Sequence, residues 1–171
     1  MTKPDLFIAG LPGCGKSHFG RWLEKEHGYL HIDFEKEQDR LLRLHGRELF
    51  RMIDIRDPAP LIEVLKKQSK PIIFNWGFLV GYMDVAASLA HHLSPYWFRA
   101  DLSLARDSFL KRADVPLAAF EKQTSDIAKH SFALDSIFGT RVIDTILPGG
   151  HKIECAKILE IIMHHENGNG A

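Results

Sequence analysis

The sequence predicts an α/β fold of three layers, with a five-stranded parallel sheet between two layers of helices. The first observation behind this prediction is the alternation of short apolar segments with segments of helical periodicity along the chain. The second is the segment G-L-P-G-C-G-K-S at residues 10–17, which follows an apolar segment and precedes a helical one. It matches the phosphate-binding loop G-x-x-x-x-G-K-S, and strand, loop and helix are the context that this motif requires.

The elements follow in order from this alternation. Apolar segments of strand length predict strands at residues 6–9, 29–32, 72–75, 96–100 and 141–144. Apolar residues at helical spacing predict helices at residues 16–27, 35–44, 58–68, 79–92, 102–112 and 151–164. The third helix has a clear start, because Asp57 can cap it and Pro58 suits the first helical position.

One segment, residues 113–131, has weaker periodicity and contains Asp114 and Pro116. In an enzyme that handles nucleotide phosphates, a small mobile lid is expected there, and an ordinary surface helix remains the alternative. No linker divides the chain, so we expect a single domain over residues 1–166, with the lid at about residues 113–131. Residues 167–171 are expected to form a flexible tail.

The loop at residues 10–17 has residue types suited to holding a phosphate. Gly10, Gly13 and Gly15 allow backbone conformations that turn successive N–H groups toward an anion. Lys16 adds a charge over the β- and γ-phosphates, and Ser17 offers a hydroxyl to Mg²⁺ at the start of a helix. The motif and its context predict the P-loop NTPase fold, with ATP and Mg²⁺ as cofactors and Lys16 in a catalytic role.

Two neighbours of these residues are also expected to contact the nucleotide, namely Cys14 within the loop and His18 directly after it. The helix N-terminus would favour a thiolate at Cys14, but a small neutral side chain that fills space is the favoured interpretation. The alternative for the whole motif is a glycine-rich turn with a solvated lysine.

Two carboxylates follow the second predicted strand. Asp33 lies at its carboxyl end and Glu35 lies two residues further on. Ligands of open parallel sheets bind at this edge, so Asp33 is expected to help hold Mg²⁺. Either Asp33 or Glu35 would accept a proton from a substrate hydroxyl. The alternative is that Asp33 caps the following helix.

Composition and charge narrow the functional classes. The chain has 171 residues, and its 22 basic and 22 acidic residues balance, which argues against nucleic-acid and anionic-membrane partners. Two cysteines cannot form a disulfide framework, the start does not resemble a signal peptide, and residues 72–90 are too interrupted for a membrane span. We expect a cytoplasmic protein, a monomer or small homo-oligomer, whose partner is a small molecule.

Beyond the loop, the sequence resembles shikimate kinases, within the wider group of nucleoside-monophosphate-kinase-like P-loop proteins. Gly28-Tyr29 followed by Asp33-x-Glu35 resembles that family's G-Y-x-x-x-D-x-D stretch. Residues 46–51, G-R-E-L-F-R, resemble its G-x-x-x-F-R stretch, whose arginine holds the substrate carboxylate.

The resemblance implies roles for several residues. Lys16 and Ser17 would serve ATP and Mg²⁺, Asp33 and Glu35 the metal and the acceptor hydroxyl, and Arg51 an acidic group of the acceptor. Arg112, at the start of the lid, would stack on adenine. Pro148, within residues 147–150, would belong to the loop that closes over adenine, although a Pro-Gly turn before a helix explains this segment equally well.

The sequence also departs from the family. Where the family has a glycine triplet after the third strand, this chain has Asn75-Trp76-Gly77. Trp76 would fill volume left for the substrate or offer it a flat apolar wall, with Gly77 beside it. The lid stretch reads Val115-Pro116-Leu117-Ala118 and lacks the expected arginine, for which Arg106, Lys111 or Arg112 of the neighbouring helix could substitute. Residues 133–137 lack a second substrate arginine. These departures count against shikimate itself as the acceptor.

Together, these observations predict a kinase that moves the γ-phosphoryl group of ATP to a hydroxyl of a small anionic metabolite. One alternative is a nucleotide-binding regulatory protein with little or no kinase activity. The other is a nucleoside monophosphate kinase, in which Arg51 and Arg56 would converge on a phosphate.

Overall fold

The structure is a computed structural model that describes residues 3–34, 55–77, 80–111 and 116–168. Its centre is one parallel sheet with the strand order β2-β3-β1-β4-β5. The strands are β1 (Leu6–Gly10), β2 (Leu30–Asp33), β3 (Ile72–Asn75), β4 (Ser94–Ala100) and β5 (Val142–Ile146). The predicted five-stranded parallel sheet is therefore confirmed.

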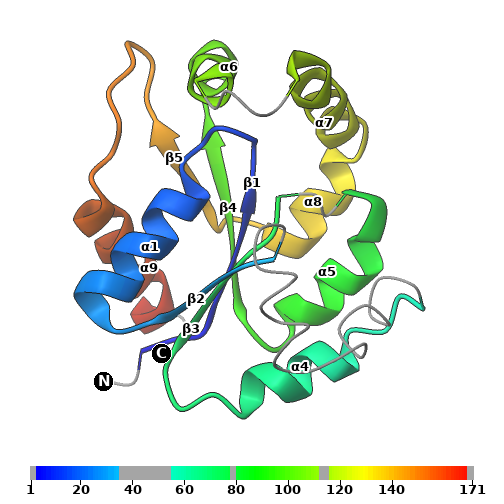
Figure 1. The fold of residues 1–171 in the computed structure, drawn as a ribbon, viewed down its shortest axis with the longest axis vertical. Coiled ribbons are helices and arrows are strands. Elements are labelled where there is room, and N and C mark those ends of the chain that lie inside the picture. The colour runs from blue at the N-terminus through cyan, green and yellow to red at the C-terminus, as the bar shows by residue number, and fades with distance from the viewer. Residues whose placement is uncertain (1–2, 35–54, 78–79, 112–115, 169–171) are drawn as a thin grey trace.

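Helices cover both faces of this sheet (Figure 1). They are α1 (Lys16–His27), α4 (Ala59–Lys66), α5 (Met83–Ala90), α6 (Leu102–Leu110), α7 (Leu117–Lys129), α8 (Ser131–Phe138) and α9 (Cys155–Gly168), and a short 3₁₀ helix, η1 (Val80–Tyr82), precedes α5. The three-layer prediction is confirmed. None of the helices in the described part of the chain has the length and apolar character needed to cross a bilayer.

The core lies in two clusters, one on each face of the sheet. The central strand β1 is buried along its whole length, and its side chains alternate between the two clusters. Phe7 packs among residues of α4, α5 and α8, whereas Ile8 packs among residues of α1, α6 and α9. This double burial explains why the strands read as short, continuous apolar segments in the sequence.

The start of α4 follows its sequence signal. Asp57 accepts a hydrogen bond from the backbone N–H of Ala59 at 3.0 Å, and the Pro58 carbonyl accepts from Ile62 at 3.0 Å. The predicted capping of this helix by Asp57 is thus confirmed. The helix predicted at residues 35–44 lies outside the described residues.

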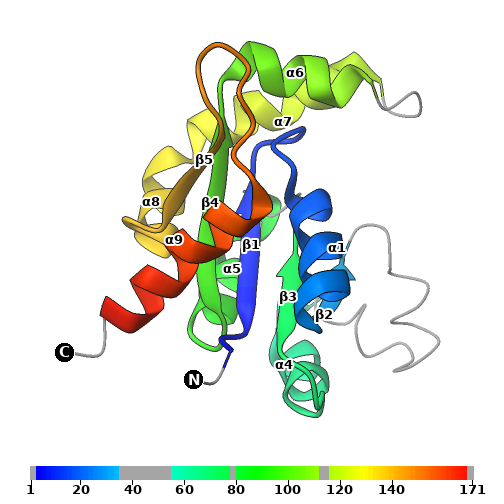
Figure 2. The same ribbon diagram turned by 90° about the vertical axis from the view of Figure 1, so that its left-hand side faces the viewer.

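Three other helices differ from the sequence expectation. The helix expected over residues 79–92 begins as η1 and becomes α-helical only at Met83. Helix α8, which was not predicted, buries Leu134 and Phe138. Helix α9 begins at Cys155 rather than at residue 151, because Leu147 and Ile153 donate backbone hydrogen bonds that make residues 147–153 a turn folded back along β5. Figure 2 shows this turn rising beside α6.

The segment expected to contain a lid is helical where the structure describes it. Helix α7 spans Leu117–Lys129 and buries Phe120 against Phe109 of α6, with ring centroids 5.3 Å apart. At the other end of the chain, α9 continues to Gly168, so the first residues of the expected tail are helical.

Candidate functional site

The glycine-rich loop joins β1 to α1 at the carboxyl edge of the sheet, and its conformation depends on glycine. Gly10, Gly13 and Gly15 have φ values of 147°, 84° and 91°. A Cβ atom on Gly13 would lie 2.1 Å from the carbonyl oxygen of Ala105 in α6, a distance that real Cβ atoms do not show. The loop therefore packs directly on α6, and only glycine fits its turns.

Lys16, the first residue of α1, lies over the loop that precedes it. Its Nζ donates hydrogen bonds to the carbonyl oxygens of Gly10 at 3.0 Å and Leu11 at 2.9 Å. The ammonium group is thus held at the mouth of the loop, next to the N-terminus of α1, which carries partial positive charge. Together these groups form a site suited to an anion such as a phosphate chain.

Ser17 and Asp33 come together as the sequence predicted. The Ser17 hydroxyl donates a hydrogen bond of 2.6 Å to Oδ2 of Asp33, which lies at the end of β2 and is 7% exposed. Both residues offer oxygen ligands, and Mg²⁺ prefers such ligands while keeping several waters. This donor set fits Mg²⁺ beside a bound phosphate chain.

The back of the loop is fixed by a residue that the sequence analysis missed. Thr145 of β5 is 4% exposed, and its hydroxyl lies 2.8 Å from the carbonyl oxygen of Cys14 and 3.1 Å from that of Arg99. The sequence signal that could have indicated it is a polar residue near the end of an apolar strand. Thr145 ties the loop to the far side of the sheet.

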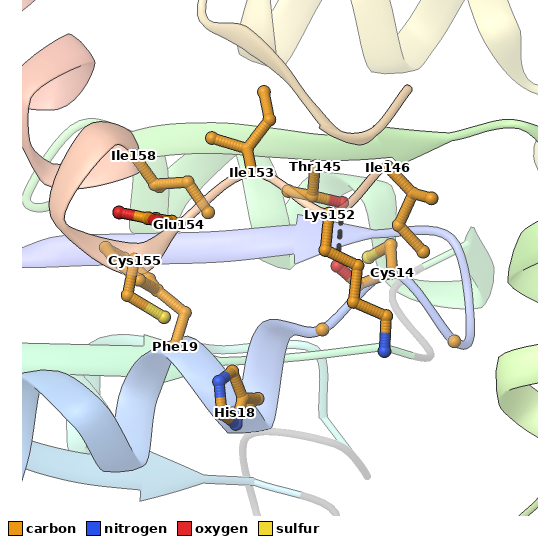
Figure 3. A pocket seen from close by; sticks show the side chains of 12 residues that line it. Cys14, His18, Phe19, Thr145, Ile146, Lys152, Ile153, Glu154, Cys155 and Ile158 are labelled. Carbon is orange, nitrogen blue, oxygen red and sulfur yellow. Dashed lines mark hydrogen bonds between the residues drawn. The ribbon is translucent and has the colours of Figure 1, made fainter. Parts of the chain in front are cut away.

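A cavity of about 270 Å³ lies beside the loop, between the start of α1 and the residues that lead into α9 (Figure 3). Gly13, Cys14, Gly15 and His18, which the sequence analysis expects to contact the nucleotide, line it. Its remaining walls are mostly apolar and come from Phe19, Thr145, Ile146, Lys152, Ile153, Glu154, Cys155 and Ile158. The size and the apolar walls suit a nucleoside next to the phosphate site.

Two cysteines are among the residues that line this cavity. Cys14 is 1% exposed, whereas Cys155 is partly exposed, and burial raises the pKa of the Cys155 thiol. Pro148 does not line the cavity. It lies in a tight turn in which Gly150 donates a backbone hydrogen bond to Leu147 at 3.0 Å, whereas Lys152 and Ile153 line the cavity together with the glycine-rich loop.

A second cavity, of about 310 Å³, opens between the end of β3 and helix α7. Gly77, one of the expected substrate residues, lines it. The other lining residues come from η1, α7 and the residue after α7, and were not singled out from the sequence: Val80, Gly81, Tyr82, Lys122, Gln123, Asp126, Ile127 and His130. Lys122 forms an ion pair of 2.8 Å with Asp126, so the polar wall contributed by α7 carries both charge signs.

Trp76, which directly precedes Gly77 in the chain, is 2% exposed. Its ring contacts Phe34 edge-on at 5.4 Å and stacks on Tyr82 at 5.9 Å. Of the two roles expected for Trp76, burial favours filling volume over offering a wall. Trp76 therefore supports Tyr82, which in turn lines the second cavity.

The remaining predicted site residues divide into two groups. Glu35, Arg51 and Arg112 lie outside the described residues. Arg56 is described, and its guanidinium makes a two-point ion pair with Asp84, the pKa of which it lowers to about 2. Two other basic residues, Arg106 of α6 and Lys111 directly after α6, are exposed.

No family model matches the sequence, and no curated protein matches it. Solved structures do resemble the fold. A shikimate kinase from Acinetobacter baumannii, in complex with shikimate, has a TM-score of 0.67 and 16% identity, covering 99% of this chain and 96% of its own. A tunicamycin resistance protein from Deinococcus radiodurans has a TM-score of 0.60 and 16% identity, over 96% of this chain and 95% of its own. A gluconokinase from Sinorhizobium meliloti 1021 has a TM-score of 0.52 and 17% identity, over 92% of this chain and 87% of its own.

The TM-scores show a likeness of fold, and identities of 16–17% leave the substrates open. The strand order, the loop after β1 and these neighbours agree. The chain has the fold of the P-loop small-molecule kinases of the shikimate kinase type.

Proposed function

We propose that this protein is an ATP-dependent phosphotransferase that moves the γ-phosphoryl group to a hydroxyl of a small metabolite. The observation that carries the proposal is the 2.6 Å contact between Ser17 and Asp33 beside the glycine loop and Lys16. It joins a hydroxyl and a carboxylate at the point where a phosphate chain would end. Kinases of metabolites among the structural neighbours support this proposal.

The donor nucleotide would occupy the loop and the 270 Å³ cavity. Loop N–H groups and Lys16 would hold the β- and γ-phosphates. His18 and residues 152–155 would contact the nucleoside, since they line the cavity together. Ser17 and Asp33 would hold Mg²⁺, and the ion would supply positive charge against the charge of the phosphates.

The acceptor would enter from the 310 Å³ cavity at the end of β3. Gly77 lines this cavity without a side chain, and Tyr82 offers an aromatic face. Lys122 and Gln123 offer hydrogen-bond donors, and Gln123 and Asp126 offer acceptors. This lining suits a polyhydroxylated acceptor, and Lys122 could hold an acidic group on it. The gluconokinase among the neighbours fits an acceptor of that class.

In the proposed reaction, an acceptor hydroxyl oxygen attacks the γ-phosphorus and the bond to the β–γ bridging oxygen breaks. The hydroxyl proton would pass to the carboxylate of Asp33 or of Glu35, the two acceptors that the sequence offers, and ADP is the leaving group. Positioning and charge neutralisation supply most of the rate, because phosphoryl transfer requires little covalent participation by the protein.

The proposal is tested by ADP release in the presence of Mg²⁺ and a panel of acceptors: gluconate, shikimate, other hydroxy acids, sugars and nucleoside monophosphates. We expect a sugar acid or a related polyol to stimulate ADP release. Asp33→Asn should bind ATP and lose turnover, whereas Lys16→Ala should lose tight ATP binding. Lys25→Ala, on the exposed face of α1, is the matched control and should behave as wild type.

A nucleotide-binding regulatory protein is a second candidate, favoured by one observation: Val115 stands where the resembling family has its lid arginine. Such a protein would bind ATP tightly, and no acceptor would raise ADP release above its own slow hydrolysis. The acceptor panel distinguishes the two functions.

A further inference from the structure

Helix α1 docks on strand β2 through two adjacent contacts. Ser17 and Gly20 are three residues apart and share one face of α1, and His31 and Asp33 are two residues apart and share one face of β2. One contact is the hydrogen bond from Ser17 to Asp33. The other brings Gly20 against the imidazole of His31, where a Cβ atom on Gly20 would lie only 2.3 Å from Cδ2 and Nε2. The imidazole is therefore the surface on which the first turns of α1 rest.

The imidazole of His31 is itself held from the neighbouring strand. Nε2 of His31 lies 2.9 Å from Nδ2 of Asn75, at the carboxyl end of β3. His31 is 5% exposed and Asn75 is 2% exposed. Asn75 is also the residue paired with Asp33 in the register of β2 and β3. The buried pair thus adjoins Asp33 on both strands.

Fold stability alone gives a poor account of this pair. Buried polar groups cost free energy unless they are hydrogen-bonded. Oδ1 of Asn75 has no hydrogen-bond partner within the described part of the chain. Apolar residues would fill this space between α1 and the sheet without that cost. Local departures of this kind gather at functional sites.

We propose that His31 and Asn75 are positioning residues for the magnesium site. The His31 ring, fixed by Asn75, sets the distance at which α1 docks on β2, and this distance keeps the Ser17 hydroxyl beside the Asp33 carboxylate. Neither residue lines the cavity assigned to the nucleoside. The proposal rests on the proposed function, since it assigns Mg²⁺ to Ser17 and Asp33.

The test is the Kd for ATP measured by calorimetry with Mg²⁺ and with EDTA, which gives the enhancement of binding by magnesium. Gly20→Ala should push α1 away from His31 and reduce the enhancement by about tenfold or more, as for other residues that orient metal ligands. Affinity in EDTA should change little. Since Ala is the better helix former, a loss would come from the contact with His31 and not from weaker helix formation.

Compensation gives the second arm. His31→Ala removes the surface on which α1 rests and should also reduce the enhancement. In the double variant, Gly20→Ala with His31→Ala, the methyl group of Ala at position 20 occupies part of the space left by the imidazole ring. The magnesium enhancement should therefore partly recover. His31→Gln, with a smaller group that can still bond to Asn75, serves if Gly20→Ala does not fold, and should show the same loss.

Leu89→Ala is the control for a general loss of stability, because Leu89 of α5 is fully buried on the opposite face of the sheet. It should lower Tm and leave the magnesium enhancement at the wild-type value. A wild-type enhancement in Gly20→Ala and in His31→Gln would overturn the positioning role. Magnesium-independent ATP binding by the wild type would instead overturn the proposed function.

Discussion

Arg56 and Asp84 form a two-point ion pair, with Nε of Arg56 2.7 Å from Oδ2 of Asp84 and Nη2 2.6 Å from Oδ1. The guanidinium also lies 5.5 Å from the ring centroid of Tyr82, on which Trp76 stacks. The guanidinium of Arg56 therefore contacts both the first turn of α5 and the ring of Tyr82, which lines the second cavity. This pairing leaves Arg56 poorly placed to hold a phosphate of a nucleotide acceptor.

The ion pair predicts a pH dependence of stability. Arg56 lowers the pKa of Asp84 from 3.8 to about 2, so the contribution is complete above about pH 4 and is lost as the pH falls to about 2. The effect is small because both side chains are half exposed. Thermal unfolding should show wild type above Asp84→Asn in Tm at pH 7, with the difference shrinking toward pH 2. An equal difference at both pH values would contradict the pairing.

Alanine substitutions at two glycines of the loop distinguish the effect of a steric clash from the effect of backbone strain. Gly13→Ala introduces both, because its φ is 84° and a Cβ would meet the Ala105 carbonyl. Gly15→Ala introduces strain alone, because its φ is 91° and nothing lies within 4 Å of a Cβ. Denaturant unfolding should show a loss of about 1–2 kcal/mol for Gly15→Ala and a larger loss for Gly13→Ala. Equal losses would show that α6 does not press on the loop.

Thr145 predicts a coupling between β5 and the nucleotide loop. Thr145→Val keeps the shape and removes the hydroxyl that lies against the Cys14 and Arg99 carbonyls, which should cost about 1–3 kcal/mol of unfolding free energy. ATP affinity should fall as well, because the loop loses its support from behind. Thr145→Ser is the matched control and should keep both properties. Unchanged affinity in Thr145→Val would show that the loop holds its shape without this contact.

Cys155 offers a chemical probe of the nucleoside cavity. Cys155 lines the cavity and is partly exposed, whereas Cys14 is buried, so a thiol reagent should modify Cys155 first. Burial raises the pKa of Cys155, so labelling should be slow at neutral pH and should accelerate as the pH rises past 9. ATP with Mg²⁺ should slow the reaction, as followed by mass spectrometry, and Cys155→Ser should abolish the labelling of this site. Labelling at the same rate with and without ATP would place the nucleoside elsewhere.

The sequence was most informative where local chemistry determines structure. The strands were predictable because they are buried on both faces, and the loop at residues 10–17 was predictable because its glycines and Lys16 form a specific motif. The approach of Ser17 to Asp33 followed from the rule that ligands bind at the carboxyl ends of parallel strands.

Other features depend on contacts between distant parts of the chain. Helix α8 was missed because its buried face consists of Leu134 and Phe138 alone, while the large apolar side chain of Phe132 is 87% exposed, so its helical periodicity is weak. The delayed start of α9 depends on pairing of Ile146 with Lys152 across a turn. The supports of the site, Thr145 and the His31–Asn75 pair, belong to no motif and became visible only through their hydrogen bonds.

The central claim is transfer of a phosphoryl group from ATP to a hydroxyl, and the most direct test follows the γ-phosphate itself. ATP labelled at the γ-phosphorus is incubated with Mg²⁺, the protein and the most effective polyol or sugar acid, and the products are separated. The account predicts label on the acceptor with wild type and none above background with Asp33→Asn. Label found only in ATP and inorganic phosphate, with every acceptor tried, would contradict it.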